Sequence, residues 1–356
     1  MLNIMMIKKN ISLIVLLVIL TVGFCFFIAY KNNKIRLLND DVKLEKIRVQ
    51  TGWLINGEFA NVCSAIVNGY YKDEGLDVEL MPGGPSGASF ILATNAIAQN
   101  DDLDIGIEGD LVPLLRGRSK DDNEKLKVKA FGALWNQVPY GFIVRQDSGL
   151  NSLKDFIKKK PDGTKYKIGV TADSVIQYAI AKYAGVSVDD LNIQIIGFDA
   201  TPFLSGQVDA LASYWTTQGY EVEKAGIAYK FLNVDEIPGF SQPSQILLAT
   251  ENKLKEKKDS LIKWLRATNK GTTYVINNPA EAAKQILDPR CGGPNFDPIQ
   301  EEWLIKKSLP LFQGQENGEI NENQVKNFAT TYYNLDQIPK IPEISELIDY
   351  SILNGI

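Results

Sequence analysis

Histidine is the residue type that this sequence lacks: there is none among its 356 residues. Mechanisms that need an imidazole are therefore excluded, among them Ser-His-Asp and Cys-His catalysis, the HExxH zinc motif and proton relays through histidine. Cysteine is scarce, with 3 residues and no closely spaced pair, so neither a disulfide scaffold nor a zinc site is indicated. We expect no metal, no cofactor and no catalytic residues, although composition leaves open an enzyme built on Asp, Glu or Lys.

An excess of basic residues is also missing. The formal net charge is -5, which argues against nucleic acid as the main partner because phosphate binding requires a basic face. The hydrophobic content of 45% and the charged content of 23% are ordinary for a globular protein. The length suffices for one large two-lobed unit or for two ordinary domains.

A long apolar run follows the N-terminal segment 1–10, which we expect to be cytoplasmic. Residues 11–30, ISLIVLLVILTVGFCFFIAY, are long enough to span a bilayer as a helix, whereas a cleaved signal peptide usually has a shorter core and a small-residue cleavage site. We therefore expect a membrane anchor, with a cleaved signal as one alternative. A lipoprotein is another, which the bulky Phe24 before Cys25 disfavours. The charged residues 31–45 are expected to form a stalk.

Strand and helix patterns alternate through the body of the chain, which predicts an α/β fold with mainly parallel sheets. Strands are expected at 47–54, 78–82, 103–108, 126–135, 141–146, 166–171, 192–198, 209–215 and 245–250. Helices are expected at 58–71, 88–99, 111–118, 151–159, 174–184, 253–276, 281–287, 299–308 and 322–334.

One sheet built from all these strands would be unusually wide, so two lobes are expected. The first lobe would comprise residues 46–140 and 239–356, and the second lobe residues 141–238. Pro or Gly beside apolar strand residues at both crossings, 140–141 and 238–243, is typical of a hinge. The alternative is two consecutive domains.

Six segments carry side chains suited to holding a small molecule, and most of them follow a predicted strand. Ligands of α/β sheets bind beyond the carboxyl ends of the strands. The candidate ligand-binding residues are Trp53, Asn56, Glu58, Ser86, Gly87, Glu108, Trp135, Asn136, Gln137, Thr171, Asp173, Ser174, Tyr214, Trp215 and Gln218.

The chemistry of these candidates differs. The Gly-rich turn at 81–90 and the turn at 171–174 each precede a predicted helix, whose free N–H groups bind an anion or a polar edge. The three tryptophans lie at or near strand ends, and aromatic planes beside amides suit a planar or compact solute. Glu58 and Glu108 could pair with a ligand amine. Each feature has a structural alternative, namely core packing, turn formation or helix capping.

The order of several segments resembles the type 2 periplasmic-binding superfamily. These segments are GYYKDEGLDVEL with PGG, DIGIEGD, the KIGV turn and GQVDAL. The resemblance covers roughly residues 46–278. Within that superfamily, the sequence is similar to the nitrate/sulfonate/taurine and thiamine-pyrimidine-precursor binding proteins of ABC importers. YWTTQGYEVEKAG, residues 214–226, looks like the pyrimidine-precursor binders in particular.

This resemblance implies two lobes that close over a small solute, an ABC permease as partner, and a body outside the membrane. The aromatic residues with Glu58 and Glu108 favour an amino-substituted heterocycle such as a thiamine pyrimidine precursor. A sulfonate, taurine or nitrate ligand is the alternative, and it would prefer a cationic side chain, which the turns lack. A membrane-anchored sensor is a further alternative. The related pyrimidine synthases require a histidine near residues 56–58 and a cysteine-rich motif, and this sequence has neither.

Overall fold

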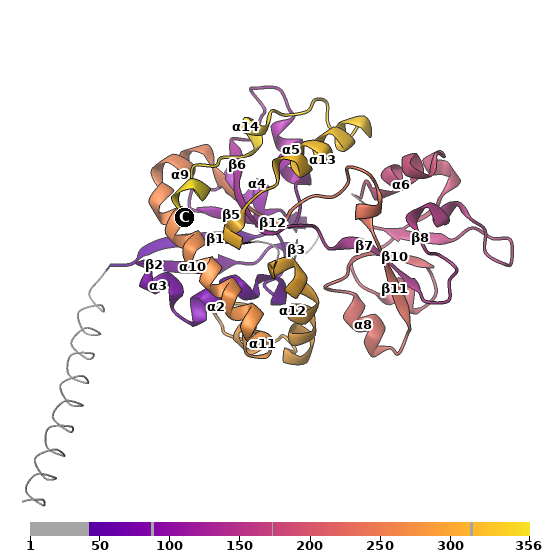
Figure 1. The fold of residues 1–356 in the computed structure, drawn as a ribbon, viewed down its shortest axis with the longest axis horizontal. Coiled ribbons are helices and arrows are strands. Elements are labelled where there is room, and N and C mark those ends of the chain that lie inside the picture. Colours follow the sequence, from indigo (N-terminus) through magenta and orange to yellow (C-terminus); the bar gives the residue numbers. More distant parts are fainter. Residues whose placement is uncertain (1–42, 87–88, 173, 314–315) are drawn as a thin grey trace, which may run out of the picture. The chain divides into compact units, whose positions relative to one another are not determined.

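Two mixed five-stranded sheets carry the fold, which the computed structural model describes for residues 43–86, 89–172, 174–313 and 316–356 (Figure 1). Residues from Lys46 to Ile356 form one compact unit. The expected membrane helix at 11–30, the segment before it and the stalk up to residue 42 lie outside the described residues. Across the described ranges, no helix has both the length and the apolar character needed to cross a bilayer.

The first sheet has the strand order β2-β1-β5-β12-β6. Its strands are β1 (Glu45–Thr51), β2 (Leu76–Met81), β5 (Ile105–Glu108), β6 (Val128–Trp135) and β12 (Ser244–Thr250). β1 and β5 are parallel, whereas β12 is antiparallel to both β5 and β6. β12 therefore lies inside the sheet although it is the last of its strands in sequence.

The second sheet has the strand order β11-β7-β10-β8-β9. Its strands are β7 (Tyr140–Arg145), β8 (Lys167–Val170), β9 (Asn192–Ile195), β10 (Ala210–Tyr214) and β11 (Tyr229–Asn233). β10 and β9 run parallel to β8, and β7 runs antiparallel to β10 and β11. Both sheets are thus mixed rather than mainly parallel, because β7 and β12 each enter their sheet directly after the chain has crossed from the other one.

Helices cover both faces of the first sheet (Figure 1). In this part of the chain they are η1 (Gly57–Phe59), α2 (Ala60–Val67), α3 (Tyr70–Asp73), α4 (Ala93–Gln99), α5 (Val112–Arg118), α9 (Glu251–Glu256), α10 (Lys258–Asn277), α11 (Pro279–Ile286), α12 (Pro298–Gln313), η5 (Glu316–Gly318), α13 (Glu322–Asn334), α14 (Ile344–Leu347) and η6 (Leu353–Gly355). Around the second sheet they are η2 (Leu153–Ile157), α6 (Ile176–Ala184), η3 (Val188–Asp190), α7 (Thr201–Leu204), α8 (Gly219–Lys224) and η4 (Val234–Glu236). α10 approaches α2 closely, since a Cβ on Gly271 would lie 2.0 Å from the carbonyl oxygen of Asn61.

Several elements differ from the sequence-based expectation. The helix expected at 88–99 begins only with α4, because the preceding residues pair as a short hairpin of β3 (Gly84–Ser86) and β4 (Ser89–Ile91). The helix expected at 58–71 breaks at Gly69, whose φ of +80° is left-handed. The long helix expected at 253–276 is divided at Lys257 into α9 and α10. β11 was not expected.

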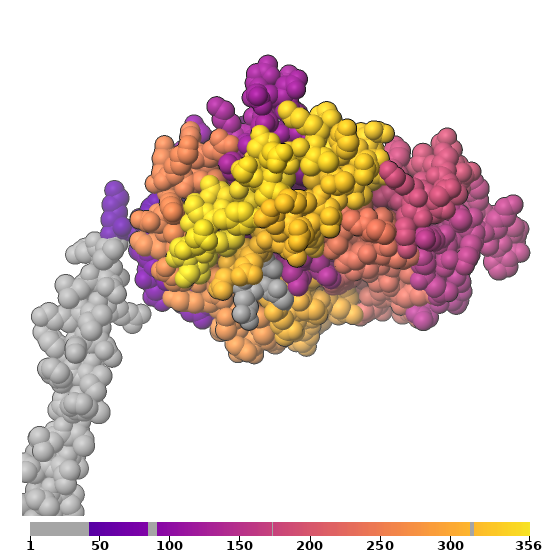
Figure 2. Space-filling model, turned by 45° about the horizontal axis from the view of Figure 1, so that its top comes forward, coloured from indigo at the N-terminus to yellow at the C-terminus, as the bar shows by residue number. Residues whose placement is uncertain are grey.

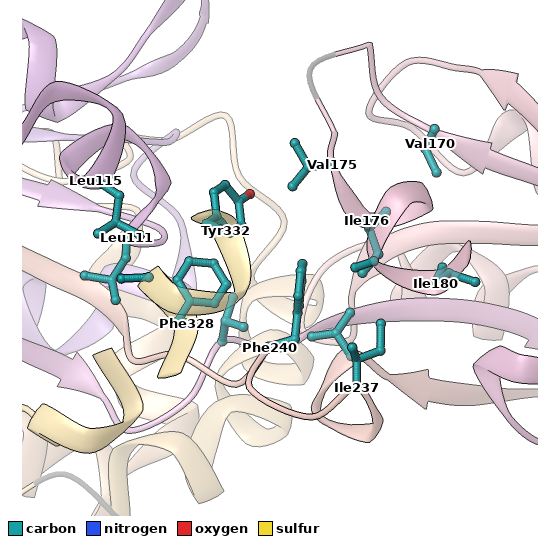
Figure 3. Packing of buried hydrophobic residues seen from close by; sticks show 14 of the residues in the cluster. Leu111, Leu115, Val170, Val175, Ile176, Ile180, Ile237, Phe240, Phe328 and Tyr332 are labelled. Carbon is teal, nitrogen blue, oxygen red and sulfur yellow. The ribbon is translucent and has the colours of Figure 1, made fainter. Parts of the chain in front are cut away.

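The two sheets share a buried apolar core where the chain crosses between them. The chain leaves the first sheet after Trp135, enters the second at Tyr140 and returns at Ser244, and the two crossing segments are joined by the bond from Val138 N–H to the Gln242 carbonyl, 2.8 Å. Figure 3 shows this core, in which α13 and the return segment meet the start of α6; the labelled residues are Leu111, Leu115, Val170, Val175, Ile176, Ile180, Ile237, Phe240, Phe328 and Tyr332.

Helix α13, in the C-terminal segment, contacts both parts of the body. Its Gln324 side chain donates to the Asn136 carbonyl at 3.2 Å and to Ser241 Oγ at 3.0 Å. At its other end, Lys182 of α6 donates to the carbonyl of Asn334 at 2.8 Å. Figure 2 shows the C-terminal segment, in yellow, extending over the first part of the body up to the residues of the second.

Candidate ligand-binding site

The loops that follow β1 and β10 meet in a buried hydrogen bond between the two lobes. The Thr216 hydroxyl donates to Glu58 Oε1 at 3.0 Å, and both side chains are buried. Asn56 holds the turn before Glu58, because its side-chain oxygen accepts the Glu58 N–H at 3.0 Å. Two residues predicted from the β1 loop therefore lie at a contact with the loop after β10.

Tyr214, at the end of β10, forms the centre of this region. Its hydroxyl donates to the Gly109 carbonyl of the first lobe at 3.4 Å. Its ring packs edge-on against Tyr140, with ring centroids 5.8 Å apart. The Tyr140 hydroxyl is 3.4 Å from Ser174 Oγ, just before α6. Residues from three strand ends and one helix start thus converge here.

Acidic groups lie close to Tyr214 along the chain and through contacts: Glu108 and Asp110 flank Gly109, which accepts from the phenol, and Glu58 accepts from Thr216. Burial raises the pKa of Tyr214 well above its usual value, and Asp110, Glu58, Tyr140 and Glu108 raise it further by their charges. Since such charge effects act over short distances, these five side chains form one cluster, which we call the acidic cluster.

The carboxyl groups of the acidic cluster have perturbed pKa values. Burial raises the pKa of Glu58 to about 7, opposed by the Thr216 hydrogen bond. Burial likewise raises the pKa of Glu108 to about 7, opposed by hydrogen bonds from Thr94. Burial also raises the pKa of Asp110, while the Val112 N–H and the Arg116 charge lower it. Near pH 7, Glu58 and Glu108 are therefore partly protonated.

Glu301 of α12 is a supporting residue that the sequence did not reveal. The Gly57 N–H donates to its Oε2 at 2.5 Å, so a buried carboxyl from the distant α12 anchors the turn that carries Glu58. Burial raises the pKa of Glu301 to about 7. No local pattern links residues so far apart in sequence, and a single Glu within a helical stretch gives no signal of this role.

The three tryptophans do not gather at one place. Trp53 packs edge-on against Phe198, which follows β9 in the second lobe, at 5.5 Å. Trp215 packs against Phe231 at 5.6 Å, and its Nε1–H donates to the Lys307 carbonyl at 3.4 Å.

Trp135 lies elsewhere. Its side chain is fully buried in the core of the first lobe against Phe312, with ring centroids 5.8 Å apart. Its neighbours Asn136 and Gln137 line a cavity of about 710 Å³ together with Ser241 and residues 319–321, 323, 324 and 327. That cavity lies beside α13 rather than at Tyr214. These three predicted residues are therefore not brought together with the acidic cluster.

The Gly-rich turn has a packing role in its described part. The Gly83 N–H donates to the Trp53 carbonyl at 3.0 Å, and a Cβ at Gly83 would lie 2.0 Å from the Thr51 carbonyl oxygen. Ser86 ends β3, and Gly87 lies outside the described residues. The turn does not lead directly into a helix as expected, because the β3–β4 hairpin intervenes.

The Glu108 carboxyl caps the start of α4, the first-lobe helix whose free N–H groups were expected to face a ligand. Its Oε2 accepts both the Thr94 N–H at 3.1 Å and the Thr94 hydroxyl at 3.0 Å, at the beginning of α4. Its Oε1 would lie 2.5 Å from a Cβ at Gly52, so glycine there makes room for the carboxyl. The capping alternative for Glu108 is thus observed, on the preceding helix rather than the following one.

The second-lobe candidates lie around the start of α6 and the end of β10. The Ser174 N–H donates to the Thr171 carbonyl at 3.1 Å, and Asp173 between them lies outside the described residues. The Gln218 side chain accepts from Ser213 Oγ and donates to the Phe198 carbonyl, so it fixes the loop after β10 against the loop after β9.

A second set of contacts joins the lobes at the surface. Glu223 of α8 accepts the indole N–H of Trp303 at 2.8 Å and the Lys307 ammonium at 3.0 Å, both from α12. The rings of Tyr220 and Trp303 are 5.7 Å apart. We call this set the α8–α12 contact. Together with the Glu58–Thr216 bond it joins the two lobes in this structure.

Known proteins are similar to this chain over much of its length. A family model described as NMT1/THI5 like matches residues 56–282. The chain is 27% identical over 269 residues to the formylaminopyrimidine-binding protein of Halalkalibacterium halodurans, covering 74% of this chain and 76% of that protein. It is 24% identical over 266 residues to the 4-amino-5-hydroxymethyl-2-methylpyrimidine phosphate synthase of Aspergillus parasiticus, covering 70% and 73%.

Solved structures share the fold. The periplasmic aliphatic sulphonate binding protein of Escherichia coli matches with a TM-score of 0.58 at 14% identity, covering 86% of this chain and 92% of that one. The expected two-lobed α/β binding-protein fold is thereby confirmed for the body, and the family resemblance inferred from the sequence is confirmed by the family model. The chain belongs to the NMT1/THI5-like family.

Proposed function

We propose that this chain is the extracytoplasmic solute-binding component of an ABC importer and that its ligand is an amino-substituted heterocycle of the thiamine-pyrimidine-precursor type. The membrane anchor expected at 11–30 would hold the body at the extracytoplasmic face of the cell membrane. The family membership and the relative named for formylaminopyrimidine binding support this proposal. The alternatives are sulfonate, taurine or nitrate binding, and a ligand sensor.

The acidic cluster is the observation that carries the choice of ligand. Three carboxyl groups, those of Glu58, Glu108 and Asp110, act on one phenol at the lobe junction. The exposed Arg116 is a cationic group that acts on one of these carboxyls, that of Asp110. Amino groups and protonated ring nitrogens donate to carboxylates, and such charge-assisted bonds are the stronger class. A sulfonate or nitrate would instead meet like charge here.

Aromatic groups complete the chemistry of this site. Tyr140 and Tyr214 pack against each other beside the carboxyl groups, and Trp53 lies between the end of β1 and the turn that carries Glu58. Rings of this kind pack against a planar heterocycle through their faces or edges. We therefore propose Trp53, Asn56, Glu58, Glu108, Tyr140, Ser174, Tyr214, Trp215 and Gln218 as the binding residues.

The binding mechanism would be closure of the two lobes. A ligand that contacts both lobes stabilises the closed state over the open one, and it shifts the population by its differential affinity. The Thr216–Glu58 bond and the Tyr214–Gly109 bond form only in the closed state. The permease would then recognise the closed form.

Proton release is a consequence that can be measured. The carboxyl groups of Glu58 and Glu108 have pKa values of about 7, so each carries a proton for part of the time at pH 7. A ligand that donates to them lowers their pKa, and protons leave the site on binding. Calorimetry of a heterocycle in two buffers of different ionisation enthalpy should therefore differ in apparent heat.

The decisive experiment is a binding comparison with the 356-residue chain in detergent. Native mass spectrometry and intrinsic Trp fluorescence should detect formylaminopyrimidine or 4-amino-5-hydroxymethyl-2-methylpyrimidine, and scattering should show a smaller radius on binding. Preference for an alkanesulfonate, taurine or nitrate would overturn the ligand assignment. Turnover of a pyrimidine or pyridoxal-type substrate would overturn the binding role, which the absence of histidine otherwise supports.

Glu58→Gln tests the role of the carboxyl directly. The amide still accepts from Thr216 but loses the charge that holds a ligand amine, so we expect affinity to fall about 10- to 100-fold. Glu302→Gln is the matched control, because Glu302 lies on α12 with its side chain partly exposed in an ion pair with Lys306. Equal affinity of the Glu58→Gln protein and the control would exclude Glu58 from the site.

A further inference from the structure

Two cysteines that are far apart in sequence meet beneath the β1 turn. Cys63 lies in α2 and Cys291 follows α11, and both are free thiols in the same buried core. Burial raises the pKa of the Cys63 thiol, and the neighbouring Cys291 side chain raises it further. Cys63 is 0% exposed and Cys291 is 9% exposed, so Cys291 is the one of the two residues that solvent touches.

The segment that carries Cys291 has a fixed backbone. The Cys291 N–H donates to the Asp288 carbonyl at 2.8 Å, and the Gly292 N–H donates to the Ile286 carbonyl at 2.9 Å. Asp288 in turn is held by two hydrogen bonds from the Arg290 guanidinium, at 2.9 and 2.8 Å. A thiol on such a segment is presented at a constant position.

The same segment presses against the backbone next to the acidic cluster. A Cβ at Gly292 would lie 2.3 Å from the Ile55 carbonyl oxygen, so only glycine permits this approach. One residue further on is Asn56, which caps the turn of Glu58. A covalent link between Cys63 and Cys291 would tie α2, the end of α11 and this turn together.

We propose that Cys63 and Cys291 form a redox-sensitive pair that is converted to a disulfide by exchange with a small exogenous disulfide. The thiolate of the more exposed Cys291 attacks one sulfur of that disulfide, giving a mixed disulfide and releasing one small thiol. The sulfur of Cys63 then attacks the Cys291 sulfur and releases the second small thiol. The two protein thiols are oxidised, the exogenous disulfide is reduced to two thiols, and their protons are carried by those thiols.

The surroundings explain the order of the two steps. Burial raises the pKa of the Cys63 thiol well above its usual value, so Cys63 stays protonated and unreactive until a disulfide is placed beside it. Cys291, at the edge, is the sulfur that a small disulfide can reach first. The product closes a very long chain loop, and such cross-links stabilise by restricting the unfolded state.

The test uses the 356-residue chain in detergent with Cys25→Ser, so that the pair is the only source of thiols. The protein is refolded with oxidised glutathione, alkylated after denaturation and mapped by mass spectrometry. We expect one peptide linked through Cys63 and Cys291 and a rise in Tm of about 4–8 °C that dithiothreitol reverses.

Two further variants establish the mechanism. Cys63→Ala should stop at a glutathione adduct on Cys291, whereas Cys291→Ala should acquire no linked peptide and no rise in Tm. If both thiols of the unsubstituted pair remain open to alkylation after oxidative refolding, or if only a stable glutathione adduct forms there, the proposal is wrong. None of these readouts depends on the ligand, so the proposed transport function and this pair can fail separately.

Discussion

Replacing Glu301 by glutamine should stabilise the protein at alkaline pH. Glu301 is 2% exposed, and burial raises its pKa from 4.5 to about 7 in the folded state. Its contribution to stability is therefore fully present below about pH 4.5 and is lost as the pH rises through about 7. The glutamine of Glu301→Gln keeps an oxygen for the Gly57 N–H but never ionises, so it avoids that loss.

The magnitude follows from the pKa. A change of one in pKa is worth about 1.4 kcal/mol, so ionising Glu301 in place costs the folded state roughly 3 kcal/mol by pH 8. In a body of this size, 1 kcal/mol corresponds to about 2 °C in Tm. We expect Glu301→Gln to raise Tm by about 4–6 °C at pH 8 and to change it little at pH 4.5.

Scanning calorimetry at pH 4.5, 6 and 8 provides the assay, with unfolding read by Trp fluorescence as a check. Glu302→Gln, one residue along α12, serves as the control and should show no pH-dependent gain, because its partly exposed side chain pairs with Lys306. The reasoning would be refuted if the change in Tm caused by Glu301→Gln were less favourable at pH 8 than at pH 4.5. Glu301 would then act as a required negative charge.

Three further substitutions test the lobe contacts and the packing. Thr216→Val removes the hydroxyl that donates to Glu58 across the lobes, and because such a bond contributes about 1.5–3 kcal/mol, calorimetric ligand affinity should fall about 10- to 100-fold. Glu223→Gln weakens the α8–α12 contact at an exposed carboxylate, so affinity should fall less than about 6-fold. Gly271→Ala places a methyl group 2.0 Å from the Asn61 carbonyl oxygen, so urea unfolding should show a loss of about 1–3 kcal/mol at every pH.

Matched controls separate these effects from general damage. Thr273→Val, on an exposed turn of α10, should leave ligand affinity unchanged. Gly197→Ala, whose Cβ would meet only the Asp199 carboxyl at 3.5 Å, should leave stability within about 0.5 kcal/mol. Unaltered affinity of Thr216→Val would mean that the Glu58–Thr216 bond is not formed in the ligand-bound state.

The strands were largely predictable because their signals are local. Runs such as KIGV and DALASY carry β-branched and apolar residues between turn residues, and β8 and β10 lie within the expected ranges. The pairing was less predictable, because the position of β12 between β5 and β6 depends on contacts between distant segments. The β3–β4 hairpin has strands of three residues, too short for an alternation pattern to register.

The candidate site was predictable where its side chains follow a strand end. Glu58, Glu108 and Tyr214 all follow or end strands, and they share one cluster. Trp135 also ends a strand, yet its ring is buried against Phe312, because β6 is buried on both faces along nearly its whole length. A residue at a strand end can thus face either way, and the sequence pattern does not distinguish the two. Glu301 escaped notice because only the folded chain brings α12 to the β1 turn.

The central position of β12 also determines the order in which the chain can fold. The strands of the second sheet are consecutive in the chain from Tyr140 to Asn233, so this sheet can assemble while the first is unfinished. The first sheet remains split between β5 and β6 until residues 244–250 arrive, which requires closing a loop that contains the entire second lobe. During synthesis or passage through a membrane, two apolar strand edges therefore stay unpaired, and the partly made chain depends on protection from aggregation until β12 has been delivered.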